Sequence, residues 1–191
     1  MPKYLDFKVS LLGIDPDIWR RFLLAESATF MDLHDAIQDA FGWEGYHLFE
    51  FREVKGRQTI AGPPDYEPEF VDEEEIPKAT EVKLKAEFAR KGRKCLYVYD
   101  FGDNWEHAVE FMDLVELPER LKRRLTGGAR ACPPEDCGGV RGHEECVLVA
   151  NKPEDEWKSL EGGEFLERKE WLGGWKPEDF DVKDAQRDFD V

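Results

Sequence analysis

The sequence predicts an α+β fold, with one compact domain over residues 1–191 and a mixed, mostly antiparallel sheet packed by helices. Three observations support this prediction. Alternating apolar segments occur near the start of the chain and again at residues 96–111, the central hairpin. Apolar residues at helical spacing occur at residues 29–41 and in the C-terminal third. The strands are grouped rather than alternating regularly with helices, which is typical of α+β proteins.

Two strands are predicted first, at residues 4–12 and 18–24. The turn at residues 13–17, which contains Gly13 and Pro16, joins them. Arg20 and Arg21 point to opposite faces of the second strand, so the two guanidinium groups are not solvated equally. We expect one of them to lie against the rim of the core and to pair with a carboxylate.

The clearest helix covers residues 29–41. Thr29 is a good N-cap, the apolar residues that follow recur on one helical face, and Gly42 ends the helix. His34 flanks the apolar stripe, where we expect a helix-surface histidine with half-buried carbons. A loop and then a strand at residues 47–54 follow.

The central hairpin has two plausible registers. A two-residue loop, Gly102-Asp103, fits a type II′ turn and places Asp100 opposite Trp105. A three-residue loop places Asp100 opposite Glu106, and like charges in that position are unfavourable. The first register is favoured, and in it Asp100 and His107 are diagonal neighbours on the core side. They form either a structural pair that closes the sheet or an acid/base or ligand-binding pair.

The remaining segments are assigned from their Gly, Pro and charged residues. An acidic loop is expected at about residues 55–79, and residues 80–89 fit a helix slightly better than a strand. A short basic segment at residues 117–125 has helical character, and the Pro- and Gly-rich residues 131–139 form an ordered loop. Further helices are expected, before an acidic tail, at residues 142–150, 154–160 and 167–172.

The composition limits the classes of partner. Lys and Arg number 27 and Asp and Glu number 43, so the net charge is 27 − 43 = −16. Such a surface repels phosphates, which makes nucleic acid an unfavourable partner and favours an unknown protein, basic in character, or a small ligand. No apolar segment is long enough to cross a membrane and the N-terminus has no signal peptide, so we expect a cytoplasmic protein.

Several motifs carry a family resemblance. Their letters, in chain order, are IWRR, LHDAIQ, FGW, YHLFEF, YVYDFGDNWEH, ACPPEDCGG and EWLGG. The chain resembles, over nearly its whole length, the family named after the third open reading frame of the hairy-root plasmid pRiA. The resemblance implies a compact α+β domain of unknown function linked to plasmids and mobile elements. Some relatives carry a resolvase-like label, but the sequence shows no serine nucleophile in an arginine-rich frame.

Polar residues of these motifs form one candidate site if the Pro-Pro-Glu-Asp loop folds over the hairpin. Its carboxylates then approach an arginine and His107, and the set binds a small polar or cationic ligand or holds the loop by salt bridges. The candidate ligand-binding residues are Arg20, Arg21, His47, Trp105, Glu135 and Asp136. The candidate catalytic residues are Asp100, Asp103 and His107.

A second candidate is a zinc site. Cys132 and Cys137 are separated by four residues, and His143 and Cys146 follow with a spacing that completes a zinc-type ligand set. A Cys132–Cys137 disulfide is the alternative. Cys95 is expected to be a small core residue.

The preferred functional hypothesis is a protein- or small-ligand-binding module linked to mobile elements. The alternative is a small hydrolase-like enzyme that uses Asp100, Asp103 and His107. The sequence contains no nucleophile elbow, P-loop or dinucleotide-binding glycine pattern to favour a known enzyme class.

Overall fold

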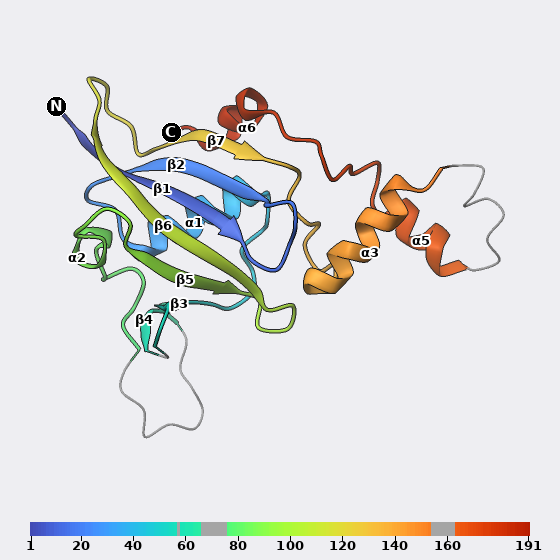
Figure 1. The fold of residues 1–191 in the computed structure, drawn as a ribbon. Helices are drawn as coiled ribbons and strands as arrows, with labels where there is room; N and C mark the ends of the chain where they lie inside the picture. Colours follow the sequence, from blue (N-terminus) through green and yellow to red (C-terminus); the bar gives the residue numbers. More distant parts are fainter. Residues whose placement is uncertain (57, 66–75, 154–162) are drawn as a thin grey trace.

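A computed structural model describes residues 1–56, 58–65, 76–153 and 163–191, and it confirms the α+β class. Seven strands form one sheet in the order β4-β3-β5-β6-β1-β2-β7 (Figure 1). Every pairing between these strands is antiparallel. The strands are β1 (Lys3–Leu11), β2 (Trp19–Ala25), β3 (Phe49–Glu53), β4 (Thr59–Ala61), β5 (Lys94–Tyr99), β6 (Trp105–Glu116) and β7 (Arg123–Ala129).

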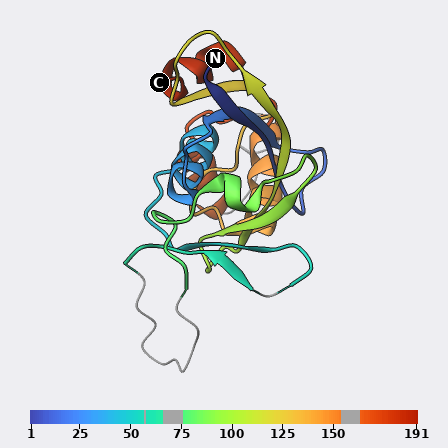
Figure 2. The same ribbon diagram turned by 90° about the vertical axis from the view of Figure 1, so that its left-hand side faces the viewer.

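The helices in the described part of the chain differ in where they lie relative to the sheet. Helix α1 (Phe30–Phe41) covers one face of the sheet (Figure 2), and the short helix α2 (Leu84–Glu87) lies in the segment before β5. Helices α3 (Gly139–Asn151) and α5 (Gly163–Trp171) project from one end of the sheet, whereas α6 (Val182–Phe189) packs beside β7 (Figure 1). The result is a two-layer domain with an appended helical pair.

The core lies between α1 and the sheet. Helix α1 begins with the predicted cap, in which the Thr29 hydroxyl accepts from the Asp32 amide while the Asp32 carboxylate accepts from the Thr29 amide. Gly42 ends the helix with a φ of 74°. The surface position expected for His34 is wrong: the residue is only 3% exposed and its ring stacks on Phe49. The hydroxyl of Tyr97, 2.8 Å from His34 Nδ1, supplies the polar partner that permits this burial.

The opposite face of the sheet is polar and carries ion pairs, one between the neighbouring strands β5 and β6 and one that reaches from β3 across β5 to β6. Lys94 Nζ lies 2.9 Å from Glu110 Oε2, and Arg52 Nη2 lies 2.5 Å from Glu106 Oε1. On β6 the buried residues alternate with these half-exposed ones, which is the pattern of a strand with one solvated face.

The hairpin register differs from both registers considered in the sequence analysis. Tyr97 faces His107 and Tyr99 faces Trp105, so the connection has five residues, Asp100 to Asn104. Asp100 and Asn104 have φ of 54° and 53°, and the Asn104 amide donates to the Asp100 carbonyl. Left-handed conformations at Asp and Asn, which tolerate them, therefore replace the glycine-led type II′ turn.

Other boundaries were also wrong. The segment at residues 117–125, expected to be helical, instead leads into strand β7, and β4 lies inside the segment expected to be loop. Of the helix expected at residues 80–89, only the single turn α2 forms, and its N-cap is Lys83 rather than Thr80. Helices α3 and α5 begin earlier than predicted, and α6 occupies what was expected to be an acidic tail. The expected helix at residues 154–160 and most of the acidic stretch at residues 65–75 lie outside the described residues.

Within the described ranges, no helix combines the length and the apolar character that crossing a bilayer requires.

Candidate functional site

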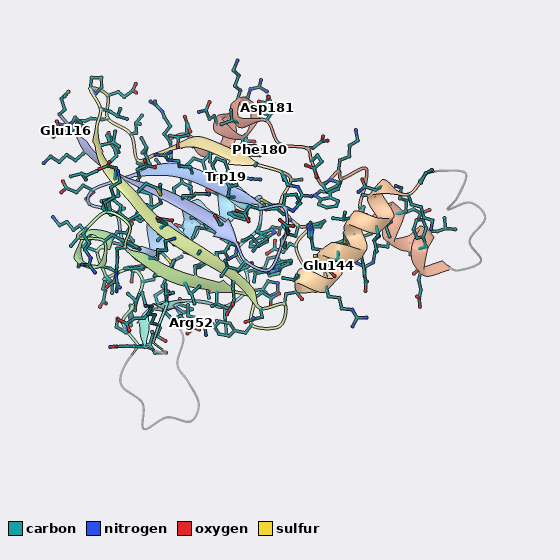
Figure 3. The ribbon with its side chains drawn as sticks, viewed as in Figure 1. Trp19, Arg52, Glu116, Glu144, Phe180 and Asp181 are labelled. Atoms are coloured by element: carbon teal, nitrogen blue, oxygen red, sulfur yellow. The ribbon has the colours of Figure 1, made fainter. Side chains whose placement is uncertain are left out.

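Burial at the core and pairing with a carboxylate, both expected of one arginine, are divided between the two arginines of β2. Arg20, which is 3% exposed, donates to the carbonyl oxygens of Trp19, Ala40, Ala129 and Arg130 and to Cys132 Sγ. Its guanidinium also lies 3.9 Å from the ring centre of Phe180, which Figure 3 shows beside β7. The carboxylate partner belongs instead to Arg21, on the outer face, which binds Asp6 through two nitrogens.

Arg20 therefore has a structural role. Of the carbonyl groups it satisfies, that of Ala40 lies in the last turn of α1 and that of Arg130 directly after β7, whereas those of Trp19 and Ala129 lie at the paired ends of β2 and β7. The guanidinium carries five N–H donors in one plane, so it can bind several carbonyl oxygens at once. Pairing with a single carboxylate would leave those carbonyl oxygens without a donor.

Three segments distant in sequence meet at one end of the sheet, and we call this place the loop junction. It consists of residues 43–47 after α1, residues 99–104 at the hairpin turn, and residues 133–139 before α3. Hydrogen bonds hold the last segment to the first two: Trp43 Nε1 to the Pro133 carbonyl (2.9 Å), the Glu44 amide to Glu135 (2.7 Å), and the Gly138 amide to Asp103 (3.0 Å). The Tyr99 hydroxyl donates to the other oxygen of Glu135.

The centre of the loop junction is formed by His47, Asp100 and Asp136. His47 Nε2 lies 2.9 Å from Asp136 Oδ1 and 3.8 Å from Asp100 Oδ2. The side chains are 28%, 14% and 54% exposed for His47, Asp100 and Asp136, so solvent reaches the group. Within the described residues, it is the one group of three or more His, Cys, Asp or Glu ligand atoms that lie within 4.8 Å of one another.

Unusual backbone conformations place these groups. Asp100 and Asp136 have φ of 54° and 59°, in the left-handed region that few residues other than glycine adopt. Gly139 has a φ of 69°, and a Cβ there would lie 2.6 Å from the carbonyl oxygen of Asp103. Glycine at this position permits the close approach of residues 133–139 to the hairpin turn.

Hydroxyl groups set the electrostatics of the loop junction. The Tyr46 hydroxyl, 2.5 Å from Asp136 Oδ2, and then His47 lower the pKa of the Asp136 carboxyl. The same hydrogen bond raises the pKa of Tyr46 to about 12. Burial, followed by the hydrogen bond to Glu135, raises the pKa of Tyr99. Both hydroxyls therefore stay protonated near neutral pH and act as donors to carboxylates.

The carboxylates of the loop junction share one further property. Asp100, Asp103, Glu135 and Asp136 accept hydrogen bonds from backbone amides, tyrosine hydroxyls and His47. In the described ranges, none of the four lies within 4.0 Å of a Lys or Arg nitrogen. The negative charge collected here lacks the cationic partners that acids on the outer sheet face have.

The Asp100–His107 pair expected from the sequence does not form. His107 is fully buried, with its Nδ1 near the carbonyls of Tyr97 and Trp105, and burial lowers its pKa to about 4. The imidazole near Asp100 is His47 instead. The one-residue difference in register leaves Asp100 in the turn, whereas His107 remains on the core face of β6.

Of the residues predicted from sequence, the structure brings together His47, Asp100, Asp103, Glu135 and Asp136. Arg20, Arg21, Trp105 and His107 lie outside this group, and Trp105 is a core residue at 1% exposure. Sequence reasoning missed the hydrogen-bonding roles of Trp43, Tyr46 and Tyr99. The available signal was the position of Tyr46 directly before His47 and of Tyr99 directly before Asp100, and the presence of Trp43 in the FGW motif.

The four predicted zinc ligands do not form one cluster in the described residues, although the thiols of Cys137 and Cys146 are in hydrogen-bond contact with each other. Cys132 is bonded to Arg20, and the His143 ring packs against Trp175 with ring centres 5.7 Å apart. Cys137 and Cys146 are buried near Arg168, whose Nη1 lies 3.5 Å from Cys146 Sγ. All four cysteines are free thiols, so the alternative Cys132–Cys137 disulfide is absent. Cys95 is a buried core residue, as predicted.

Comparison with known proteins agrees with this fold. The "Uncharacterized protein y4hQ" of Sinorhizobium fredii (strain NBRC 101917 / NGR234) is 31% identical over 170 residues, which cover 87% of this chain and 79% of that protein. The crystal structure of the protein of unknown function MM3350 from Methanosarcina mazei Go1 superposes with a TM-score of 0.75 at 35% identity, covering 96% of this chain and 98% of that one. The family described as "Plasmid pRiA4b ORF-3-like protein" matches residues 3–184. The chain therefore belongs to the plasmid pRiA4b ORF-3-like protein family.

Proposed function

We propose that this protein is a binding module that recognises a cationic ligand at the loop junction. The observation that carries this proposal is the set of four carboxylates, Asp100, Asp103, Glu135 and Asp136, which have hydrogen-bond donors but no Lys or Arg partner among the described residues. A cation brought there gains attraction without displacing a Lys or Arg side chain.

The surroundings favour the same class of ligand. The side chains of Tyr46 and Phe101 are 57% and 50% exposed beside the carboxylates, and aromatic faces attract cations. The net charge of −16 adds a long-range attraction for positive ligands that decreases as salt is added. The association with plasmids and mobile elements rests on the resemblance alone, and the experiments below do not depend on it.

Binding of a model cation tests the proposal. Calorimetric titration with trilysine amide at low salt should show saturable binding that weakens in the double variant Glu135→Gln/Asp136→Asn. Asp17→Asn, which removes one exposed acid that is not part of the loop junction, should bind as the wild type does. Acetylated trilysine, which lacks the ammonium groups, should not bind.

Two results would overturn the proposal. One is equal binding of the charged and acetylated peptides. The other is the absence of binding by both the peptide and the divalent metal ions considered next.

A further inference from the structure

We propose that the cation held at the loop junction is a divalent transition-metal ion, with His47, Asp100 and Asp136 as its protein ligands. This inference rests on the proposed function of the same surface and names its ligand.

The spacing of the donor atoms fits such an ion. Nitrogen and oxygen ligands lie about 2.1 Å from zinc, so two ligands of one ion are about 3 to 3.5 Å apart. His47 Nε2 is 2.9 Å from Asp136 Oδ1 and 3.8 Å from Asp100 Oδ2, and these values lie on either side of that range. Shifts of a few tenths of an ångström bring both of these distances into the range, and all three donor atoms lie within 4.8 Å of one another.

The second oxygen of each aspartate already has a different partner. Asp136 Oδ2 accepts from the Tyr46 hydroxyl at 2.5 Å, and Asp100 Oδ1 accepts from the Gly102 amide at 3.0 Å. In each carboxylate, the oxygen left over is the one directed at His47 Nε2. Hydrogen bonds to the non-ligating oxygen are the usual means by which proteins orient a metal-binding carboxylate.

The donor set identifies the class of ion. One imidazole nitrogen with two carboxylate oxygens suits Zn²⁺, Co²⁺, Ni²⁺ or Mn²⁺ better than Mg²⁺ or Ca²⁺, which prefer oxygen ligands alone. Three protein ligands leave coordination positions for water or an external oxygen donor, as in sites that bind or transform a ligand. On binding, the metal replaces the proton of His47 Nε2, and that proton leaves to solvent.

The competing site is the cysteine set. Cys132, Cys137 and Cys146 would present thiolates beside the imidazole of His143, and the spectrum of bound Co²⁺ distinguishes thiolates from a site of nitrogen and oxygen ligands alone. Cys146→Ser removes a thiol from that set and alters none of the side chains of His47, Asp100 and Asp136, so it is the matched control for variants of His47 and Asp136.

The experiment uses the full chain stripped of metal with a chelator. Calorimetry with Zn²⁺, Mn²⁺ and Mg²⁺ is expected to show one equivalent of Zn²⁺ bound, and His47→Ala and Asp136→Asn should each weaken this binding more than about tenfold. Tyr46→Phe, which removes the hydrogen bond to Asp136, should weaken Zn²⁺ binding about tenfold while the circular dichroism spectrum stays unchanged. Cys146→Ser and Asp17→Asn should bind as the wild type does. Bound Co²⁺ should lack the intense thiolate-to-cobalt band.

The remaining outcomes separate the two proposals. Binding of trilysine amide without Zn²⁺ binding overturns the metal site and leaves the cation-binding function intact. Zn²⁺ binding that is unaffected by His47→Ala and Asp136→Asn, or a thiolate-to-cobalt band that Cys146→Ser abolishes, overturns the metal site as placed here. Absence of binding by both probes overturns both proposals.

Discussion

Mild acid should destabilise the protein through its buried histidines. Burial lowers the pKa of His34, His107 and His143 to about 4 in the folded chain, compared with about 6.5 in an unfolded one. Because the pKa is lower in the folded state, these neutral histidines make their full contribution to the free energy of unfolding above about pH 6.5. This contribution is lost as the pH falls from 6.5 towards 4, where only the unfolded state binds the proton.

The size of the effect follows from the two pKa values. For one histidine shifted in this way, linkage gives a loss of about 2 kcal/mol in the free energy of unfolding between pH 7 and pH 5. The variant His107→Phe removes one such group from a site lined by the rings of Phe41, Trp43 and Tyr97. Its free energy of unfolding should therefore fall by about 2 kcal/mol less than that of the wild type over the same interval.

Urea denaturation at pH 7 and pH 5, followed by tryptophan fluorescence, measures this difference. Each protein is compared with itself at the two pH values, so any change in stability that His107→Phe causes at pH 7 cancels. An equal loss in wild type and variant would refute the reasoning, because His107 would then titrate alike in both states.

Three further predictions concern other parts of the fold. Arg20→Lys keeps the charge but leaves buried carbonyl oxygens without a donor. Urea denaturation should show a free energy of unfolding about 3 kcal/mol lower than that of the wild type. A loss of less than about 0.5 kcal/mol would contradict the structural role of Arg20. Gly139→Ala should weaken Zn²⁺ binding more than about tenfold in calorimetry, because its Cβ meets the Asp103 carbonyl. Gly92→Ala is the matched control, with a φ of 80° and no atom within 4 Å of the added Cβ, and equal binding by the two variants would exclude a steric cause. Thr29→Ala should cost about 1 kcal/mol of stability by removing the cap of α1, and an unchanged urea midpoint would contradict that.

Much of the fold follows from local patterns in the chain. The N-cap and C-terminal glycine of α1 and the alternation along β1 and β2 are local signals, and the structure confirms them. The hairpin register was missed because the turn uses Asp100 and Asn104, not a glycine, in left-handed conformations. A single residue of register then decides which side chain faces Asp100.

The candidate site was predictable in part. The polar residues of the hairpin and of the Pro-Pro-Glu-Asp loop were expected to meet, and His47, Asp100 and Asp136 do so. The partners of the buried arginine were not predictable from sequence. They are backbone carbonyls at the ends of α1 and β7, and whether such carbonyls lack another partner depends on tertiary packing rather than on residue type. Helix α6 was missed because Asp181, its N-cap, precedes a strongly charged segment that resembles a solvated tail.

Anomalous diffraction from crystals grown with Zn²⁺ tests the central claim most directly. Data collected on both sides of the zinc absorption edge should show one peak within bonding distance of His47 Nε2, Asp100 Oδ2 and Asp136 Oδ1. A peak among Cys132, Cys137, His143 and Cys146 with none at the loop junction, or the absence of any peak, would contradict the claim.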